Sequence, residues 1–178
     1  MTETNSTAIK TIWLALLVII FDQLTKMIAV STLEFGIPVA VMPNLNWTLA
    51  YNYGAAFSFL ADMGGWQRWF FIALAVVISA GLTYWLSKLP NKLDIDVWGI
   101  NLVLGGAIGN VIDRIIEGRV TDFIDFYIGT WHYATFNIAD VAITVGAALL
   151  IISEFFFKKN ADEQSANKDK EPSESSKS

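Results

Sequence analysis

The chain has 178 residues, of which 54% are hydrophobic and 16% are charged, against about a quarter charged in ordinary soluble domains. The absence of cysteine excludes a disulfide scaffold, a thiolate zinc site and a cysteine nucleophile, and the single histidine, His132, leaves little for a histidine metal site or a Ser-His-Asp triad. The net charge of −5 argues against a nucleic-acid partner, so the composition indicates a membrane protein whose chemistry rests on carboxylates, hydroxyls, amides, Lys or Arg.

Each of four apolar stretches is long enough to cross the hydrocarbon core of a bilayer, which takes about 20 helical residues. The stretches cover residues 12–30, 69–86, 97–116 and 136–157. The sequence therefore predicts an α-helical polytopic membrane protein with four transmembrane helices, in a single membrane-embedded domain over 1–159. The remaining residues, 160–178, are rich in Ser, Lys, Glu, Asp and Asn and predict a disordered polar cytoplasmic tail.

The first apolar stretch also has features of a cleaved signal peptide. Lys10 gives it a positive start, and residues 29–31 loosely resemble a small-residue cleavage site. Asp22 and Lys26 lie between the apolar run and that site, where signal peptides rarely place charges, and this favours a retained helix. Because the two residues are four apart, they share one helical face and can pair there with each other or with other buried polar groups.

Residues 31–67 form a long loop that carries strand-like patterning. Residues 47–51 alternate between large apolar and small or polar side chains, a period of two typical of a strand, and 37–42 is a candidate second strand. Open sheet edges cannot face lipid, so we expect a small extracytoplasmic β-sheet above the hydrocarbon. The short apolar segment 54–60 is expected to lie along the membrane surface as a helix.

Positive charges in the loops predict the orientation in the membrane. One side carries Lys10, Lys88, Lys92, Lys158 and Lys159. The other side carries only Arg68 and Arg119 in its loops. This distribution predicts a multi-pass protein of the bacterial inner (cytoplasmic) membrane, with both termini cytoplasmic and the loops 31–67 and 117–135 on the outer, periplasmic face.

Ionisable groups inside membrane segments are functional candidates, because each costs several kcal/mol to bury there. Polar residues gather toward the helix ends predicted to be outer, or in the adjoining loop: Asp22, Lys26, Asn110, Asp113, Arg114, Asn137, Asp140, Asp122 and Asp125. Asp113 and Arg114 are adjacent and of opposite charge, which favours a structural ion pair between them. Gly105 and Gly109 form a small-xxx-small pair that permits close helix packing.

Asp122 and Asp140 differ from the other acids, because each lies among apolar neighbours without an adjacent cation. Two carboxylates brought together cannot both ionise cheaply, so one of them holds a proton near neutral pH. Such a pair can activate water and protonate a leaving amine, as in aspartic proteases. On composition alone, a role for these residues as helix caps or structural acids is at least as well supported.

Five motifs, in order along the chain, carry a resemblance to a known family. They are Asp22-Gln23-Leu24-Thr25-Lys26, Asn52-Tyr53-Gly54-Ala55-Ala56-Phe57-Ser58, Gly105-Gly106-Ala107-Ile108-Gly109-Asn110-Val111-Ile112-Asp113-Arg114, Val120-Thr121-Asp122-Phe123 and Phe136-Asn137-Ile138-Ala139-Asp140. Over about residues 10–157 the chain resembles lipoprotein signal peptidase, the bacterial signal peptidase II that removes signal peptides from prolipoproteins. Thr121 departs from the family pattern, in which Val or another apolar residue is expected.

The resemblance implies an aspartic endopeptidase that cleaves diacylglyceryl-modified prolipoproteins before the lipidated lipobox cysteine, with catalytic aspartates at Asp122 and Asp140. Polar positions thought to shape the family's site fall on Asp22, Lys26, Asn52, Asn110, Arg114 and Asn137. Gly54 would allow the substrate backbone to approach Asn52 closely, whereas Asp22 and Lys26, like Asp113, fit a structural role better. The implied partners are the prolipoprotein substrates and membrane lipid. No metal, organic cofactor, nucleic acid or obligate protein partner is implied.

Two other functions compete with this interpretation. A Ser-Lys protease would pair Lys26 with Ser58 or Ser79, but Ser79 falls in mid-helix and Ser58 has no obvious partner. A small membrane transporter or assembly factor would use the buried carboxylates as a proton relay. A transporter would usually show inverted repeats or broken helices, with charges that reach the midplane or both faces, whereas the charges of this chain gather near one face.

Overall fold

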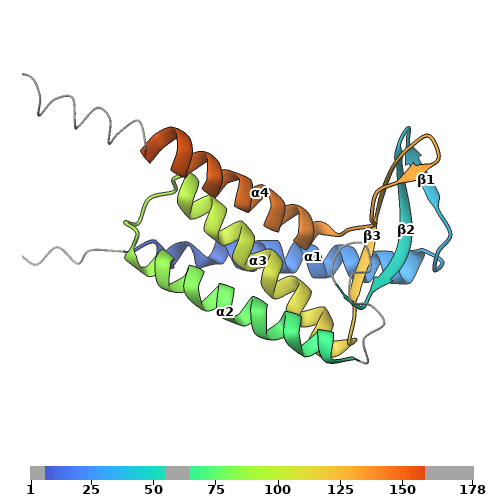
Figure 1. Ribbon diagram of the computed structural model, residues 1–178, viewed down its shortest axis with the longest axis horizontal. Coiled ribbons are helices and arrows are strands. Elements are labelled where there is room, and N and C mark those ends of the chain that lie inside the picture. The colour runs from blue at the N-terminus through green and yellow to red at the C-terminus, as the bar shows by residue number, and fades with distance from the viewer. Residues whose placement is uncertain (1–6, 55–64, 159–178) are drawn as a thin grey trace, which may run out of the picture.

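The structure is a computed structural model that describes residues 7–54 and 65–158 (Figure 1). Its helices are the 3-10 turn η1 (Ala8–Ile12), α1 (Trp13–Thr32), α2 (Trp66–Lys88), α3 (Ile95–Ile116), α4 (Ile138–Ile152) and the π-helical turn η3 (Ser153–Lys158). Alone or with these adjoining turns, α1 to α4 are four helices long and apolar enough to cross a membrane, which confirms the predicted spans. The expected tail over 160–178, and the expected surface helix over 54–60 apart from Gly54, lie outside the described residues.

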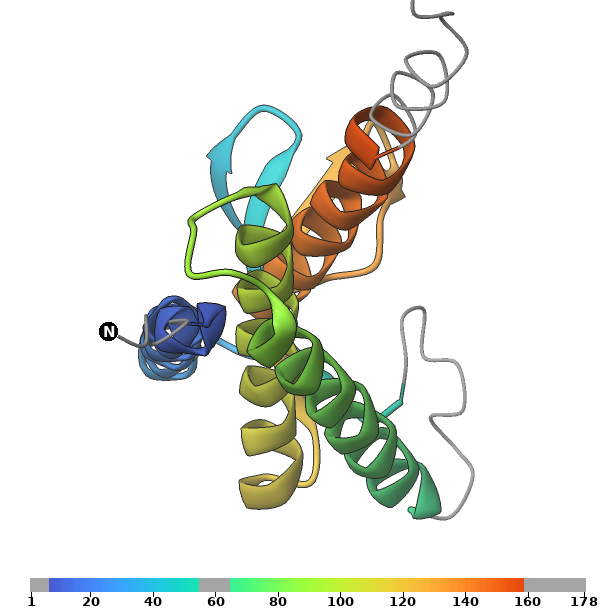
Figure 2. The ribbon, with the colours of Figure 1, turned by 90° about the vertical axis from the view of Figure 1, so that its left-hand side faces the viewer.

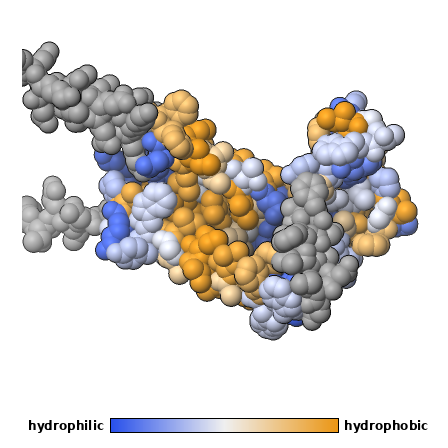
Figure 3. Space-filling model, viewed as in Figure 1, coloured by the Kyte–Doolittle hydropathy of each residue, from blue (hydrophilic) through white to orange (hydrophobic). Residues whose placement is uncertain are grey.

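Helix α3 is the central element of the bundle. It packs against α1, α2 and α4, which spread around it in Figure 2. Half of the α3 span is buried in the molecule, against 6% of the α2 span, so α2 presents most of its surface outward. On the face seen in Figure 3, the surface of the helices is largely hydrophobic and hydrophilic side chains gather at the helix ends and around the sheet, as a bilayer requires.

Glycines on α3 allow the neighbouring helices to come close. A Cβ atom at Gly105 would lie 2.8 Å from the carbonyl oxygen of Ala15 on α1, and one at Gly109 would lie 2.6 Å from Asp22 Oδ2. The predicted role of this glycine pair in close packing is thereby confirmed. Gly106, on another face of α3, meets the backbone of Ala139 at the start of α4 in the same way.

A four-stranded antiparallel sheet lies at one end of the bundle (Figure 1). Its strands, in spatial order, are β1 (Val39–Met42), β2 (Leu45–Asn52), β3 (Val120–Ile128) and β4 (Trp131–His132). Strand β2 confirms the strand predicted from the alternating pattern, and β1 confirms the candidate strand over 37–42. No strand was predicted within the outer loop 117–135, but it contains β3, which pairs along β2 with Ala50 opposite Asp122 and Asn46 opposite Asp125.

The described chain begins and ends at the same end of the bundle, away from the sheet (Figure 1). Thr7 forms a β-bridge with Pro90 in the α2–α3 connection, which places the start of the described chain beside that connection. Four spans require this arrangement, because an even number of crossings returns the chain to the side on which it started. The sheet and the adjoining polar residues therefore share the opposite end.

Candidate active site

Asp122 and Asp140 are brought together by Asn137, although they come from different elements. Asp122 lies on β3 with 2% of its surface exposed, and Asp140 lies in the first turn of α4. The side-chain amide of Asn137 donates a hydrogen bond to Asp122 Oδ1 at 2.7 Å. Its Oδ1 accepts a hydrogen bond from the backbone N–H of Asp140 at 3.0 Å. One asparagine therefore contacts both residues of the predicted pair.

Residues 137–140 form a capping box at the start of α4. Asn137 is the N-cap residue, and Asp140 Oδ2 accepts a hydrogen bond from the Asn137 backbone N–H at 3.3 Å. The alternative interpretation of Asp140 as a helix-capping acid is thus confirmed for one of its oxygens. The other oxygen, Oδ1, accepts a hydrogen bond from Asn110 Nδ2 at 2.8 Å. The same interpretation is wrong for Asp122, which lies on a strand.

The environment of Asp122 favours its protonated form. Burial raises the pKa of Asp122, the negative charge of Asp140 raises it further, and together they bring it to about 7. Hydrogen bonds from Asn137 and Asn52 and the positive charge of Lys26 act in the opposite direction and do not cancel the effect of burial. Near neutral pH the pair can therefore hold one proton, which a water-activating carboxylate pair needs.

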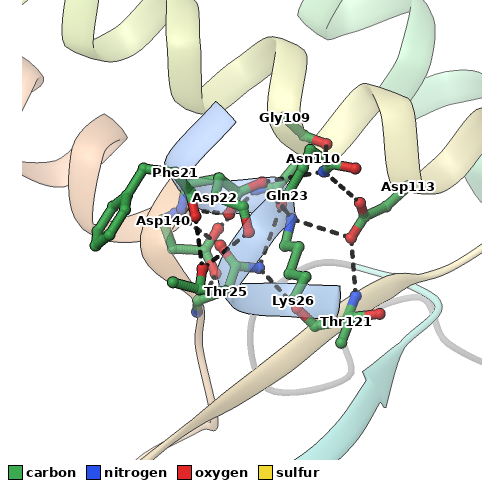
Figure 4. Close-up of polar contacts among 12 residues, drawn as sticks. Phe21, Asp22, Gln23, Thr25, Lys26, Gly109, Asn110, Asp113, Thr121 and Asp140 are labelled. Atoms are coloured by element: carbon green, nitrogen blue, oxygen red, sulfur yellow. Dashed lines mark hydrogen bonds and ion pairs between the residues drawn. The ribbon is translucent and has the colours of Figure 1, made fainter. Parts of the chain in front are cut away.

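A buried ion cluster centred on Lys26 of α1 lies next to this pair and contacts Asn110, which donates a hydrogen bond to Asp140. The ammonium of Lys26 lies 2.8 Å from Asp22 and 3.0 Å from Asp113, and it donates to Asn110 Oδ1 at 3.0 Å (Figure 4). Asp22 in turn accepts a hydrogen bond from the Ala139 backbone N–H at 2.9 Å. The predicted Asp22–Lys26 pair is confirmed, and the cluster ties α1 to α3 and to the start of α4.

The predicted ion pair between Asp113 and Arg114 is wrong. Adjacent residues on an α-helix point about 100° apart, so the two side chains leave α3 in different directions. Asp113 pairs with Lys26 and accepts hydrogen bonds from Gln23 Nε2 at 2.8 Å and from the Thr121 backbone N–H at 3.1 Å. These roles of Gln23 and Thr121 were not predicted, although both residues lie inside the motifs that carry the family resemblance.

Arg114 instead joins α3 to the end of β2. Its Nη2 donates to the carbonyl oxygen of Gly54 at 3.2 Å, and its guanidinium lies 5.1 Å from the centre of the Phe71 ring. Asn52 accepts a hydrogen bond from the Gly54 backbone N–H at 3.0 Å and donates one to Asp122. The residues predicted to shape the site are therefore connected to one another and to the pair.

A cavity of about 480 Å³ opens beside these residues. It is lined by Asn52, Gly54, Asn110, Arg114, Val120, Tyr133, Ala134, Thr135, Phe136, Asp140, Val141, Ile143, Thr144 and Val145. One wall is polar and contains five predicted site residues, and the other follows the apolar side of α4. Among the described residues, Asp122 and Asn137 lie behind this wall and do not line the cavity, in keeping with their deep burial.

Asp125 is separate from the site, although the sequence analysis grouped it with the other acids. It lies three residues beyond Asp122 on β3, on the opposite face of the strand. Burial would raise the pKa of Asp125, but hydrogen bonds from His132, Asn46 and Thr48 hold it below its usual range. Within residues 7–54 and 65–158, no group of three or more His, Cys, Asp or Glu side chains is arranged to hold a metal ion.

The contacts of Lys26 also argue against a Ser-Lys protease. An ammonium has three N–H donors, and those of Lys26 face Asp22, Asp113 and Asn110. All three acceptors belong to this cluster, so within the described residues the ammonium of Lys26 makes no contact with a serine hydroxyl. Ser79 lies within α2, which does not contribute to the ion cluster, and Ser58 lies outside the described residues.

Comparison with known proteins identifies the family to which this chain belongs. The family model for signal peptidase (SPase) II matches residues 14–156. The chain belongs to the signal peptidase II family. The lipoprotein signal peptidase of Hydrogenovibrio crunogenus is 63% identical over 158 residues, which cover 89% of this chain and 92% of that relative. The lipoprotein signal peptidase of Acinetobacter baumannii is 52% identical over 156 residues, which cover 86% and 89%.

Solved structures agree with the signal peptidase II assignment. One, described as a bacterial membrane enzyme at 2.3 Å resolution, matches with a TM-score of 0.72 and 34% identity, covering 92% of this chain and 93% of that chain. A second bacterial membrane enzyme, at 1.9 Å resolution, matches with a TM-score of 0.72 and 36% identity, covering 84% and 94%. The resemblance found in the motifs is confirmed, and the chain is a multi-pass membrane peptidase.

Proposed function

We propose that this chain is an intramembrane aspartic endopeptidase that removes the signal peptide from diacylglyceryl-modified prolipoproteins, with Asp122 and Asp140 as the catalytic pair. Membership of the signal peptidase II family supports prolipoproteins as substrates. The observation that carries the catalytic assignment is the link through Asn137, which connects the buried Asp122 to Asp140, a lining residue of the 480 Å³ cavity. Cleavage falls before the lipidated lipobox cysteine.

In the proposed reaction, Asp140 is the ionised member of the pair and Asp122 is the neutral one. Asp140 accepts hydrogen bonds from Asn110 and from a backbone N–H, which stabilise a carboxylate, whereas the pKa of Asp122 is raised to about 7. Asp140 takes a proton from water, and the water oxygen bonds to the scissile carbonyl carbon while Asp122 donates its proton to the carbonyl oxygen.

Collapse of the tetrahedral intermediate restores both aspartates. The carbonyl oxygen returns its proton to Asp122, the C–N bond breaks, and Asp140 transfers the proton from water to the departing amine of the lipidated cysteine. Each carboxyl regains its starting protonation state, so the pair can act again without another group. The residues Asn52, Gly54 and Arg114, which meet at the polar wall of the cavity, would hold the substrate backbone in register.

We further propose that the site opens near the periplasmic face of the inner membrane. The lysine-rich loops lie at the end of the bundle away from the sheet, and the positive-inside rule assigns that end to the cytoplasm (Figure 1). The apolar wall of the cavity on α4, which includes Val141 and Val145, would receive the signal peptide, while the acyl chains of the substrate stay in lipid.

The test is cleavage of a lipidated prolipoprotein by the purified protein in lipid, with Asp122→Asn and Asp140→Asn in parallel. Both variants should lose at least about 100-fold in rate, because each removes a group that transfers a proton. Asp125→Asn is the matched control, since it makes the same change on β3 outside the site, and it should stay active. Near-normal cleavage by either dyad variant, or equal cleavage of an unlipidated substrate, would overturn the proposal.

A further inference from the structure

A second cavity, of about 380 Å³, lies on the side of the ion cluster that faces away from the active site. It is enclosed by the C-terminal half of α1, the end of α3 and strands β2 and β3. Lys26 and Asp113 form part of its floor, and Figure 4 shows them beside Thr121, which also lines it. Among the described residues, the two cavities share no lining residue. The proposed peptidase mechanism makes no use of this second cavity.

The mouth of the second cavity is apolar and faces outward. Met27 and Val30 on α1 are 65% and 50% exposed, and Ile116 at the end of α3 is 70% exposed. These residues lie where the membrane-spanning helices reach the sheet, at the level where hydrocarbon gives way to lipid headgroups. A ligand that fits this mouth therefore carries long apolar chains.

The rim of the cavity carries a cation with unused hydrogen-bond donors. The guanidinium of Arg119 lies 3.4 Å from the centre of the Tyr51 ring, and its Nη1 donates to the hydroxyl of Tyr53 at 3.2 Å. Within the described residues this is its one hydrogen bond, and its Nε is buried without a partner. Stacking and a single hydrogen bond hold the guanidinium in place, and the remaining N–H donors on Nη1 and Nη2 suit a phosphate group.

A carboxylate stands beside this cation on the same rim. Glu117 is exposed, lines the cavity, and interacts electrostatically with Arg119. No hydrogen bond to its side chain is formed within the described residues. Lys26, by contrast, already has two carboxylate partners, Asp22 and Asp113, so its charge is engaged within the protein. The rim itself therefore offers a ligand one positive and one negative charge, Arg119 and Glu117, side by side at the headgroup level.

We infer that the second cavity binds one glycerophospholipid with a zwitterionic phosphate–amine headgroup. The phosphate is held by Arg119, the amine lies against Glu117, and the acyl chains follow Met27, Val30 and Ile116. An anionic headgroup without an amine would leave Glu117 facing the phosphate, and a free phosphate would leave the apolar mouth uncovered. The bound lipid would brace α1 and α3 against the sheet, on the far side of the ion cluster from the catalytic pair.

Native mass spectrometry of the full chain, released from mixed vesicles of phosphatidylethanolamine and phosphatidylglycerol, tests this inference. The wild type should retain one phosphatidylethanolamine per chain. Arg119→Gln should weaken its retention about tenfold to 100-fold, as expected for the loss of a charge-assisted hydrogen bond. Arg119→Lys, which keeps the charge, should recover part of the affinity, and Glu117→Gln should remove the preference over phosphatidylglycerol. The readout is binding alone, so the result does not depend on peptidase activity.

Arg68→Gln is the matched control, because it removes an arginine at the same end of the bundle that does not line the cavity. It should retain the lipid as the wild type does. Inorganic phosphate and acyl-free glycerophosphoethanolamine, added in excess, should not displace the lipid. Equal retention by Arg119→Gln and wild type, equal loss in Arg68→Gln, or displacement by inorganic phosphate would each overturn the inference.

Discussion

Asn137 combines a helix-capping role with a hydrogen bond to the proposed catalytic residue Asp122 in one side chain. Its oxygen caps α4 by accepting the Asp140 backbone N–H, while its amide nitrogen donates to Asp122. The side chain is fully buried, so neither hydrogen bond can be replaced by bulk water. The start of α4 and the position of Asp122 relative to Asp140 therefore depend on the same group.

Substitutions at this position should separate the two roles. Asn137→Ser keeps a favourable N-cap residue but loses the amide donor, whereas Asn137→Ala loses both, so the alanine variant should be less stable than the serine variant by about 1 kcal/mol. Both should cleave a lipidated prolipoprotein at least about tenfold more slowly, because Asp122 loses a hydrogen bond while buried. Chemical unfolding and cleavage assays measure the two effects, and wild-type activity in Asn137→Ser would contradict the assignment.

The raised pKa of Asp122 predicts how activity and stability vary with pH. Its ordinary value is 3.8 and its value in the folded protein is about 7, so between these the folded protein binds more protons than the unfolded chain. The free energy of unfolding should therefore decrease as the pH rises from about 4 to about 7. Cleavage should fall as the pH rises above about 7, because Asp122 then loses the proton that it donates.

The control for this profile is Asp125→Asn, which removes a carboxyl with a lowered pKa on the same strand. Its alkaline limb should coincide with that of the wild type. A wild-type rate that stays constant from about pH 6 to about pH 9 would show that Asp122 is not the proton donor.

At the level of elements, the contact between α3 and α4 positions Asp140. A Cβ atom on Gly106 would overlap the carbonyl oxygen of Ala139 and lie 2.8 Å from Ile143 Cγ1. The backbone of Ala139 cannot yield without moving the first turn of α4. That turn holds Asp140 next to Asn110 and Asn137.

Gly106→Ala should therefore destabilise the protein by about 1–3 kcal/mol, as for other overpacked contacts, and slow cleavage as well. Gly81→Ala on α2 is the matched control, because a Cβ atom there meets nothing within 4 Å. That change should be neutral or stabilise the helix by up to about 1 kcal/mol. The free energy of unfolding of the two variants is measured in the same detergent. Equal values would show that the α3–α4 contact tolerates a methyl group.

Features with a local pattern could be predicted from the sequence at this scale. The four helices follow from length and hydropathy, β2 follows from its alternation, and the Asp22–Lys26 pair follows from its spacing. Strand β3 could not be recognised in this way, because most of Val120–Ile128 is apolar on both faces and its pairing with the distant β2 is not encoded locally. Its β-branched and aromatic residues were the available signal.

Hydrogen-bond and ion-pair partners that are distant in the sequence could not be predicted either. Asp113 is next to Arg114 in the chain, yet it pairs with Lys26 from another helix, because helix geometry separates neighbours and tertiary packing brings distant residues together. The motifs indicated Asp122 and Asp140, and the structure links the two through Asn137. The supporting hydrogen bonds from Gln23 and Thr121 depend on how α1 and β3 meet α3, which a sequence does not display.

The two ends of the molecule along its long axis differ in structure. The sheet and both cavities lie at one end, and the described chain starts and ends at the other (Figure 1). The proposed cleavage of exported prolipoproteins requires the sheet end to face the periplasm. Because the chain contains no cysteine, a single introduced thiol reports the side of the membrane on which its residue lies.

Glu34→Cys, between α1 and β1, and Lys92→Cys, between α2 and α3, place exposed thiols at opposite ends of the bundle. In intact cells, a membrane-impermeant maleimide should label Glu34→Cys and leave Lys92→Cys unmodified, because the lysine-rich side stays in the cytoplasm. After the membrane is solubilised, both variants should react, which controls for burial of either thiol. Labelling of Lys92→Cys alone in intact cells would mean that the topology is the reverse of the one proposed, with the proposed catalytic pair on the cytoplasmic side, where it would not meet exported prolipoproteins.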